Sequence, residues 1–479
     1  MSCGAAMATA PISQVTTATI DFDANRYKTI IWLALPTVFA MLSQSFVNEI
    51  DVFFFAHLPQ PESSNGQAAL LPSLIIVWLF GGSLSALSVG TQALAARRFA
   101  EGDREGAGAV LTNATFFCVV MGAIFSIVGY LLLPAILGFM LKNQEVLATA
   151  TAYARWRLLG VISMATTMAI KSFFDGIGKT YVHLVAALIM NVFNVLFCWM
   201  FIFGRFGAPR LGAPGAGLGA FLATWIGLLI MLVFARAIRN DFSLFHRAHV
   251  SFKLNWDILK LSIPAALANI IMMGGFALFS KVVGKLDETD AGAVGAVAEA
   301  VNGAATTDIV AILKLTFTAC IAFGTATATL VGQSLGARRP DDASAFGWAS
   351  VRLGLVLFGF IGLCEGVFFT PELLHFLSHS DAVRDAAMLP MRMMGLMTPI
   401  IAVAMILSEA LFGAGNPKFV AVAQFLLVFC CLLPVAYVLG IVLHLGLLGI
   451  WMAACLYAGF AALVMTLKFR GGAWKKIRL

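Results

Sequence analysis

Apolar runs of 20 residues or more, separated by short polar loops, repeat along almost the whole 479-residue chain. A membrane-spanning helix needs about 20 such residues, and inside a bilayer only helices and closed barrels satisfy every backbone hydrogen bond. Charged residues make up 11% of the sequence, whereas soluble domains contain about 25%. We therefore predict an all-α polytopic membrane protein.

Twelve transmembrane helices are expected. Their approximate ranges are 30–57, 69–95, 107–133, 153–177, 182–204, 214–238, 257–285, 300–332, 343–369, 391–412, 419–443 and 446–468. Most of the 31 Lys and Arg residues fall before the first span, after the last, or between an even-numbered span and the next one. By the positive-inside rule, both termini are expected in the cytoplasm. The short tails lead us to expect a protein of a bacterial inner membrane.

Short motifs of the first half return in the second half, in the same order. Leu33-Ala-Leu-Pro36 recurs as Leu261-Ser-Ile-Pro264, and TQALAARR at 91–98 recurs as GQSLGARR at 332–339. The offsets of the repeated motifs lie between 228 and 241 residues, which predicts two parallel six-helix repeats. Such repeats are typical of transporters that bind substrate near the middle of the bilayer. A channel remains an alternative, although the chain has no filter sequence of the TVGYG type.

The repeat divides the chain into five expected parts. These are a disordered cytoplasmic tail at 1–25, an N-terminal lobe at 26–238, a cytoplasmic linker at 239–256, a C-terminal lobe at 257–468 and a basic cytoplasmic tail at 469–479.

The first span carries a polar face inside an apolar helix. Gln44, Asn48 and Asp51 stand at i, i+4 and i+7, so they share one face and are candidates for lining a cavity. A carboxylate at this depth costs several kcal/mol unless it is protonated, paired or hydrated. Pro36 and its repeat Pro264 each remove a backbone donor, which predicts a hinge in each helix. Asp51 is therefore the candidate proton-binding residue.

Other polar side chains in the spans are further candidates. Asn191, Asn194 and Cys198 share one face of the fifth span, which fits a face turned toward the first span. The alternatives are that the Asn residues only hold helices together, or that they only cap a buried Asp51. Asp308 and Lys314 lie deep in the eighth span, where substrate contact and a structural salt bridge are both open.

Carboxylates near the ends of other spans are expected to reach water. Glu299, Glu365 and Glu409 are in this position.

The sequence contains no HExxH motif and no clustered His and Asp residues in its spans. We therefore expect no enzyme, no catalytic residue, no cofactor and no metal site. The basic residues follow the loops rather than forming a patch, so nucleic acid is not an expected partner.

Five motifs carry a resemblance to a known family. They are Asn48-Glu-Ile-Asp51 fifteen residues after Pro36, SFFDGIGKT at 172–180, NVLFCWMFIFG at 194–204, GLGAFLAT at 217–224, and GQSLGARRP at 332–340. In this order they resemble the multidrug and toxic compound extrusion (MATE) transporters. The resemblance implies a V-shaped pair of six-helix lobes around a central cavity, and we expect a monomer. It also implies an antiporter that exports organic, often cationic or amphipathic compounds in exchange for protons or sodium ions.

The resemblance also implies a coupling site. One branch of the family builds it from an acid on helix 1, an Asn and an Asp on helix 5, and a Thr on helix 6. Asp51, Asn194 and Thr224 match these positions, with Asn191 nearby, but Cys198 stands in place of the second acid. A hard cation prefers oxygen ligands, so the thiol favours protons, and sodium remains an alternative.

A lipid-linked oligosaccharide flippase of the same superfamily is a further alternative. Such a flippase would be favoured by many basic residues at mid-membrane depth, but only Lys171, Lys281, Lys314 and Arg352 lie in the spans.

Overall fold

The computed structural model describes residues 25–141, 143–245, 250–294, 301–378, 380–477 and 479. The side chains of 48, 49 and 289–294 are outside this description, as are Glu299 and residues 1–24 of the tail predicted at 1–25. The described part of the chain is helical throughout and contains no strand. The predicted all-α fold is therefore confirmed.

The first half of the chain contributes ten helical segments. They are α1 (Arg26–Ala56), α2 (Glu62–Val77), the π-helical turn η2 (Trp78–Gly82), α3 (Ser83–Ser85), α4 (Leu87–Ala100), α5 (Arg104–Met140), α6 (Gln144–Leu159), α7 (Val161–Gly176), α8 (Tyr181–Phe203) and α9 (Ala213–Ala237). The short α10 (Arg239–Phe242) follows in the predicted linker.

The second half begins with α11 (Phe252–Val294). It continues with α12 (Val301–Gly336), α13 (Pro340–Leu363), η4 (Cys364–Phe368), α14 (Thr370–Leu377), α15 (Asp381–Gly413), α16 (Pro417–Leu426), η5 (Leu427–Leu432), α17 (Leu433–Tyr437), η6 (Val438–Val442), α18 (Gly446–Arg470) and η7 (Ala473–Lys476).

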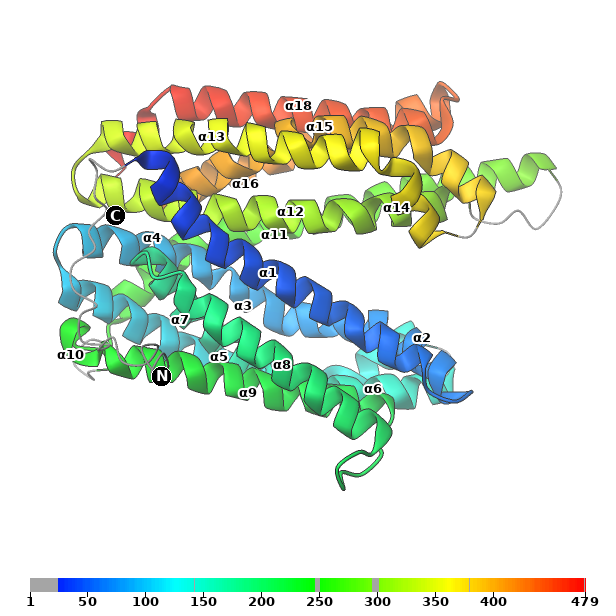
Figure 1. The fold of residues 1–479 in the computed structure, drawn as a ribbon, viewed down its shortest axis with the longest axis horizontal. Helices are drawn as coiled ribbons and strands as arrows, with labels where there is room; N and C mark the ends of the chain where they lie inside the picture. The colour runs from blue at the N-terminus through cyan, green and yellow to red at the C-terminus, as the bar shows by residue number, and fades with distance from the viewer. Residues whose placement is uncertain (1–24, 142, 246–249, 295–300, 379, 478) are drawn as a thin grey trace, which may run out of the picture.

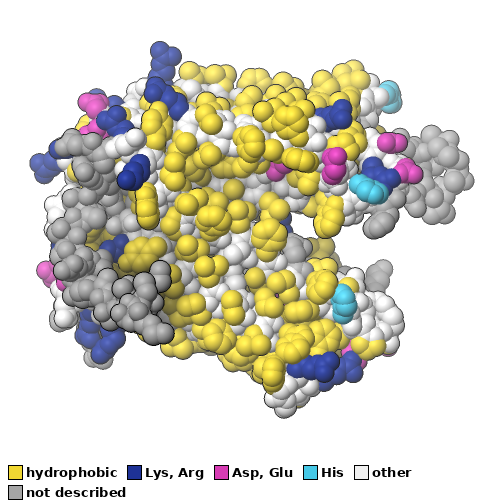
Figure 2. Space-filling view, viewed as in Figure 1, with side chains coloured by type: hydrophobic (Ala, Val, Ile, Leu, Met, Phe, Trp, Pro, Cys, Tyr) yellow, Lys and Arg dark blue, Asp and Glu magenta, His cyan; other side chains and the backbone are white. Residues whose placement is uncertain are grey.

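Eleven helices of the described chain are long and apolar enough to cross a membrane, and one bent pair brings the number to twelve. The bent pair is α6 and α7, which meet at 42° around Gly160. The sequence predicted a single helix here, because an isolated glycine is tolerated inside a helix and does not announce a bend. Apolar side chains cover the middle of the molecule, and charged side chains gather at its ends (Figure 2).

The two halves form two helical layers that meet at one end and separate at the other (Figure 1). At the closed end, α4 of the first half packs against α11 and α12 of the second. At the open end, the molecule is hollowed between the layers (Figure 2). Arg26 and Lys475 line the same cavity, so both ends of the described chain lie at the closed end.

The first helix contacts both halves. Ile30 and Ala34, near its start, belong to a core built mainly by the second half. Phe55, near its end, packs with Tyr153 and Cys198 in a core of the first half. The helix continues through Pro36, which lies inside its bounds. α1 therefore runs from the closed end of one half to the open end of the other (Figure 1).

Candidate functional site

Asp51 is a buried carboxylate near the open end of α1. Asp51 is only 7% exposed to solvent. The hydroxyl of Tyr153, on α6, donates a hydrogen bond to Asp51 Oδ2 at 3.1 Å. The other oxygen, Oδ1, is buried and has no hydrogen-bond partner among the described residues. A buried polar atom without a partner is unfavourable, so Oδ1 is a place where a proton would relieve a desolvated charge.

Two further side chains face Asp51. The Arg157 guanidinium lies one turn after Tyr153, with Cζ 5.8 Å from the centre of the Tyr153 ring, and it interacts electrostatically with Asp51. The Cys198 thiol, from α8, lies near enough to interact electrostatically with Asp51. Three helices, α1, α6 and α8, therefore supply a carboxylate, a phenol, a guanidinium and a thiol to one small buried region. We call Asp51, Tyr153, Arg157 and Cys198 the Asp51 cluster.

Sequence reasoning missed Tyr153 and Arg157. A signal for Arg157 was present, because Arg157-Leu-Leu-Gly160 recurs as Arg392-Met-Met-Gly395 in the second half. Arg157 lies near the expected outer end of a span, where a basic residue reads as part of a loop. Tyr153 carries no such signal, because a single tyrosine is common at the end of a span.

Of the residues expected to join Asp51, Asn194 is connected through the thiol. The Cys198 thiol donates to Asn194 Oδ1, with sulfur and oxygen 3.6 Å apart. Asn191 instead donates to Ser43 Oγ at 3.0 Å and so links α8 to α1 about two turns from Asp51. Thr224 Oγ1 accepts a hydrogen bond from Ser163 at 2.9 Å. The structure thus brings Asp51, Cys198 and Asn194 together and gives Asn191 and Thr224 other partners.

The remaining candidates lie elsewhere. Gln44 is half-buried on α1, and the side chain of Asn48 is outside the described residues. Asp308 is half-buried and Lys314 is exposed, and both belong to α12 of the second half. Pro36 and Pro264 each lie inside a continuous helix, so their role as hinges stays a prediction.

A carboxylate of the second half differs from its expected setting. Glu365 lies in the π-helical turn η4 and accepts a hydrogen bond from the Thr316 hydroxyl on α12. Its Oε2 is buried and has no partner among the described residues. The expectation that this side chain reaches water is therefore wrong, because the widened turn at the end of α13 directs it toward α12.

The closed end is joined by two glutamines from the repeated motif. Gln92 of the first half donates to Thr329 Oγ1 of α12 at 2.9 Å. Gln333 of the second half donates to the carbonyl of Gly176 at 2.7 Å. Each glutamine reaches across to the other half, so the duplicated motif forms a reciprocal contact.

Charged groups are also enclosed at this end. Lys171 and Asp175 form an ion pair of 2.9 Å on α7, and Asp175 is 1% exposed. Glu409 of α15 faces Lys171 from the second half and interacts with it electrostatically. Thr329 Oγ1 donates to the carbonyl of Asp175 at 2.9 Å. The closed end is therefore sealed by hydrogen bonds and charge, whereas the open end is hollowed.

Comparison with known proteins gives three consistent similarities. The MatE family model matches residues 36–200 and 264–438, more than half of the chain. The chain is 25% identical over 457 residues to a probable multidrug resistance protein NorM of Thermotoga maritima, covering 94% of this chain and 93% of the relative. It is 24% identical over 349 residues to the multidrug resistance protein PmpM of Pseudomonas aeruginosa, covering 69% and 68%.

Two solved structures share the fold. The outward-facing conformation of a multidrug resistance MATE family transporter superposes with a TM-score of 0.83 at 20% identity, covering 96% of this chain and all of the other. A MOP superfamily transporter from Pyrococcus furiosus gives a TM-score of 0.81 at 19% identity, covering 95% and 98%.

Proposed function

Because the chain belongs to the MatE family of multidrug efflux transporters, we propose that it exports organic, often cationic or amphipathic compounds in exchange for protons. The observation that carries the exchange is the Asp51 cluster: a carboxylate that is buried, bonded through Oδ2 and unpartnered at Oδ1. A proton on Oδ1 would neutralise this group inside the membrane. A substrate that binds more tightly when the Asp51 carboxylate is ionised would compete with that proton.

The surroundings of Asp51 favour a proton over a sodium ion. Arg157 places a positive charge beside the carboxylate, which stabilises the ionised form and opposes the binding of either cation. Cys198 offers a neutral sulfur where a hard cation would need an oxygen ligand. When the proton leaves, the same guanidinium compensates the negative charge of the buried carboxylate.

For the exchange to occur, the site must open to each side of the membrane in turn. The sealed end carries the basic termini, so we assign it to the cytoplasm by the positive-inside rule, and the hollowed end then faces outward. In the opposite state, the bonds of Gln92 and Gln333 across the closed end would break. α1 is suited to couple these events, because it packs in one half near Ile30 and in the other near Phe55.

The test is dye transport by the purified protein in liposomes. We expect ethidium to be moved when a pH gradient is imposed, with no movement under a sodium gradient of equal size. Asp51→Asn should abolish the pH-driven movement, because an amide cannot exchange a proton. The matched control Asp241→Asn changes an exposed acid of α10 in the same way and should transport normally. Sodium-driven transport, or undiminished transport by Asp51→Asn, would refute the proposal.

A further inference from the structure

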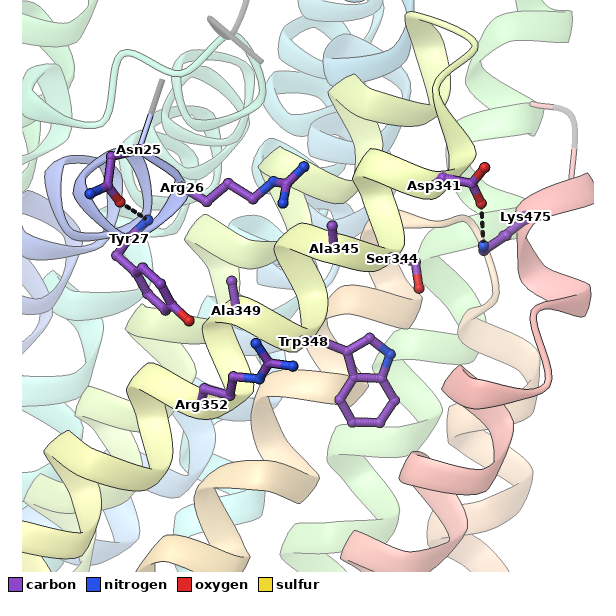
Figure 3. A pocket seen from close by; sticks show the side chains of 10 residues that line it. All are labelled: Asn25, Arg26, Tyr27, Asp341, Ser344, Ala345, Trp348, Ala349, Arg352 and Lys475. Carbon is purple, nitrogen blue, oxygen red and sulfur yellow. Dashed lines mark hydrogen bonds and ion pairs between the residues drawn. The ribbon is translucent and has the colours of Figure 1, made fainter. Parts of the chain in front are cut away.

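A cavity of about 800 Å³ lies at the closed end, between the start of α1, the first half of α13 and the C-terminal segment. Three basic side chains and two aromatic ones line it: Arg26, Arg352, Lys475, Tyr27 and Trp348. Figure 3 shows Arg26 and Arg352 on two different helices, with the small side chain of Ala349 drawn between them and Ala345 nearby.

The charges around this cavity do not balance. Lys475 is bound to Asp341 at 2.9 Å, and Arg26 is bound to Asp342 at 3.1 Å. Arg352 is exposed, and no acidic partner for it occurs in the described ranges of the chain. The cavity therefore contains one uncompensated guanidinium beside a second whose partner is shared with Arg339.

The depth of Arg352 in the membrane limits what can neutralise it. It lies twelve residues after Pro340 in a span that runs from Pro340 to Phe368, which places its Cα about 18 Å along the helix. An exposed arginine at such a position extends its side chain toward the headgroups, because the hydrocarbon cannot solvate its charge. Tyr27 and Trp348 are the residue types that gather at the headgroup level.

We propose that this cavity binds the phosphate of an anionic phospholipid headgroup from the leaflet at the closed end. Arg352 and Arg26 provide planar guanidinium groups, which bind phosphate through paired hydrogen bonds. The lipid would connect the first turn of α1 to α13. Because α1 also reaches the Asp51 cluster, this site would fix one end of the helix that carries the candidate proton-binding residue. The lipid site itself does not depend on which ion is exchanged.

Native mass spectrometry of the full chain in detergent tests the site, with phosphatidylglycerol and phosphatidylcholine of equal chain length added in turn. We expect preferential retention of phosphatidylglycerol, and Arg352→Gln should weaken its binding about tenfold or more, as expected for loss of a charge-assisted hydrogen bond. Arg236→Gln is the matched control, because Arg236 is an exposed arginine at the end of α9 that does not line the cavity.

A second variant keeps all three cations. Ala345→Phe fills the cavity and should also lower phosphatidylglycerol binding, which keeps the test valid even if Arg352→Gln does not fold. Equal retention of both lipids, or equal losses in Arg352→Gln and Arg236→Gln, would overturn the proposal. Displacement of phosphatidylglycerol by millimolar inorganic phosphate would assign the site to a soluble phosphate and would also overturn the lipid assignment.

Discussion

The two halves of the molecule repeat the same fold but differ at the position of the buried acid. At the spacing that relates Pro36 to Pro264, Asp51 of the first half corresponds to Phe279 of the second. Phe279 is 2% exposed and packs edge-on against Trp451, with ring centres 5.5 Å apart. One copy therefore holds a carboxylate where the other holds an aromatic core.

The halves match in the glutamines with which they contact each other at the closed end. Gln92 and Gln333 occupy matching positions and each bonds to the opposite half. Arg157 and Arg392 also match in sequence, but Arg157 interacts with Asp51 and Arg392 is exposed. Duplication thus supplies a symmetric seal at the closed end, whereas the chemistry proposed for transport belongs to the first half alone.

The largest expected effect is on stability, when an acid is placed in the second half at Phe279, the position that corresponds to Asp51. Phe279→Asp removes the contact with Trp451 and buries a charge without a partner, which should destabilise the protein by about 3–5 kcal/mol. Asp51→Asn, which preserves shape, should change stability much less. Thermal unfolding in detergent measures both. If Phe279→Asp were as stable as the wild type, the second half would tolerate an acid and the contrast would fail.

The two matched arginines give the next effect. Arg157→Gln removes the charge that compensates Asp51 and should lower pH-driven transport at least about tenfold, since charge-assisted contacts contribute about 1.5–3 kcal/mol. Arg392→Gln, the same change in the exposed copy, should leave transport within about twofold, as is usual for surface positions. Initial rates in liposomes make the comparison. Similar losses in both variants would show that the halves act alike.

The smallest effect on transport is expected at Glu365 of the second half. Glu365→Gln keeps the shape of a side chain that already accepts a bond from Thr316. Coupled transport should therefore change by less than about twofold, because the account assigns no proton transfer to this group. Transport that no longer responds to the pH gradient in this variant would place a coupling residue in each half.

The fold could be predicted from sequence because its signals are strong and local. Long apolar runs define the spans, and repeated motifs such as that around Gln92 define the two halves. Asp51 also stood out, since an acid is conspicuous in an apolar helix. Tyr153 and Arg157 could not be assigned to it, because their approach depends on how α6 packs against α1 and on the bend at Gly160. The turn of Glu365 toward Thr316 likewise depends on a π-helical turn that the sequence does not reveal.

In the proposed mechanism, Asp51 exchanges a proton for substrate. The most direct measurement is proton release from the purified protein in weakly buffered detergent solution when ethidium is added. We predict release from the wild type and from Asp241→Asn, and none from Asp51→Asn at saturating dye. Undiminished release from a folded Asp51→Asn variant that still binds ethidium would contradict the account.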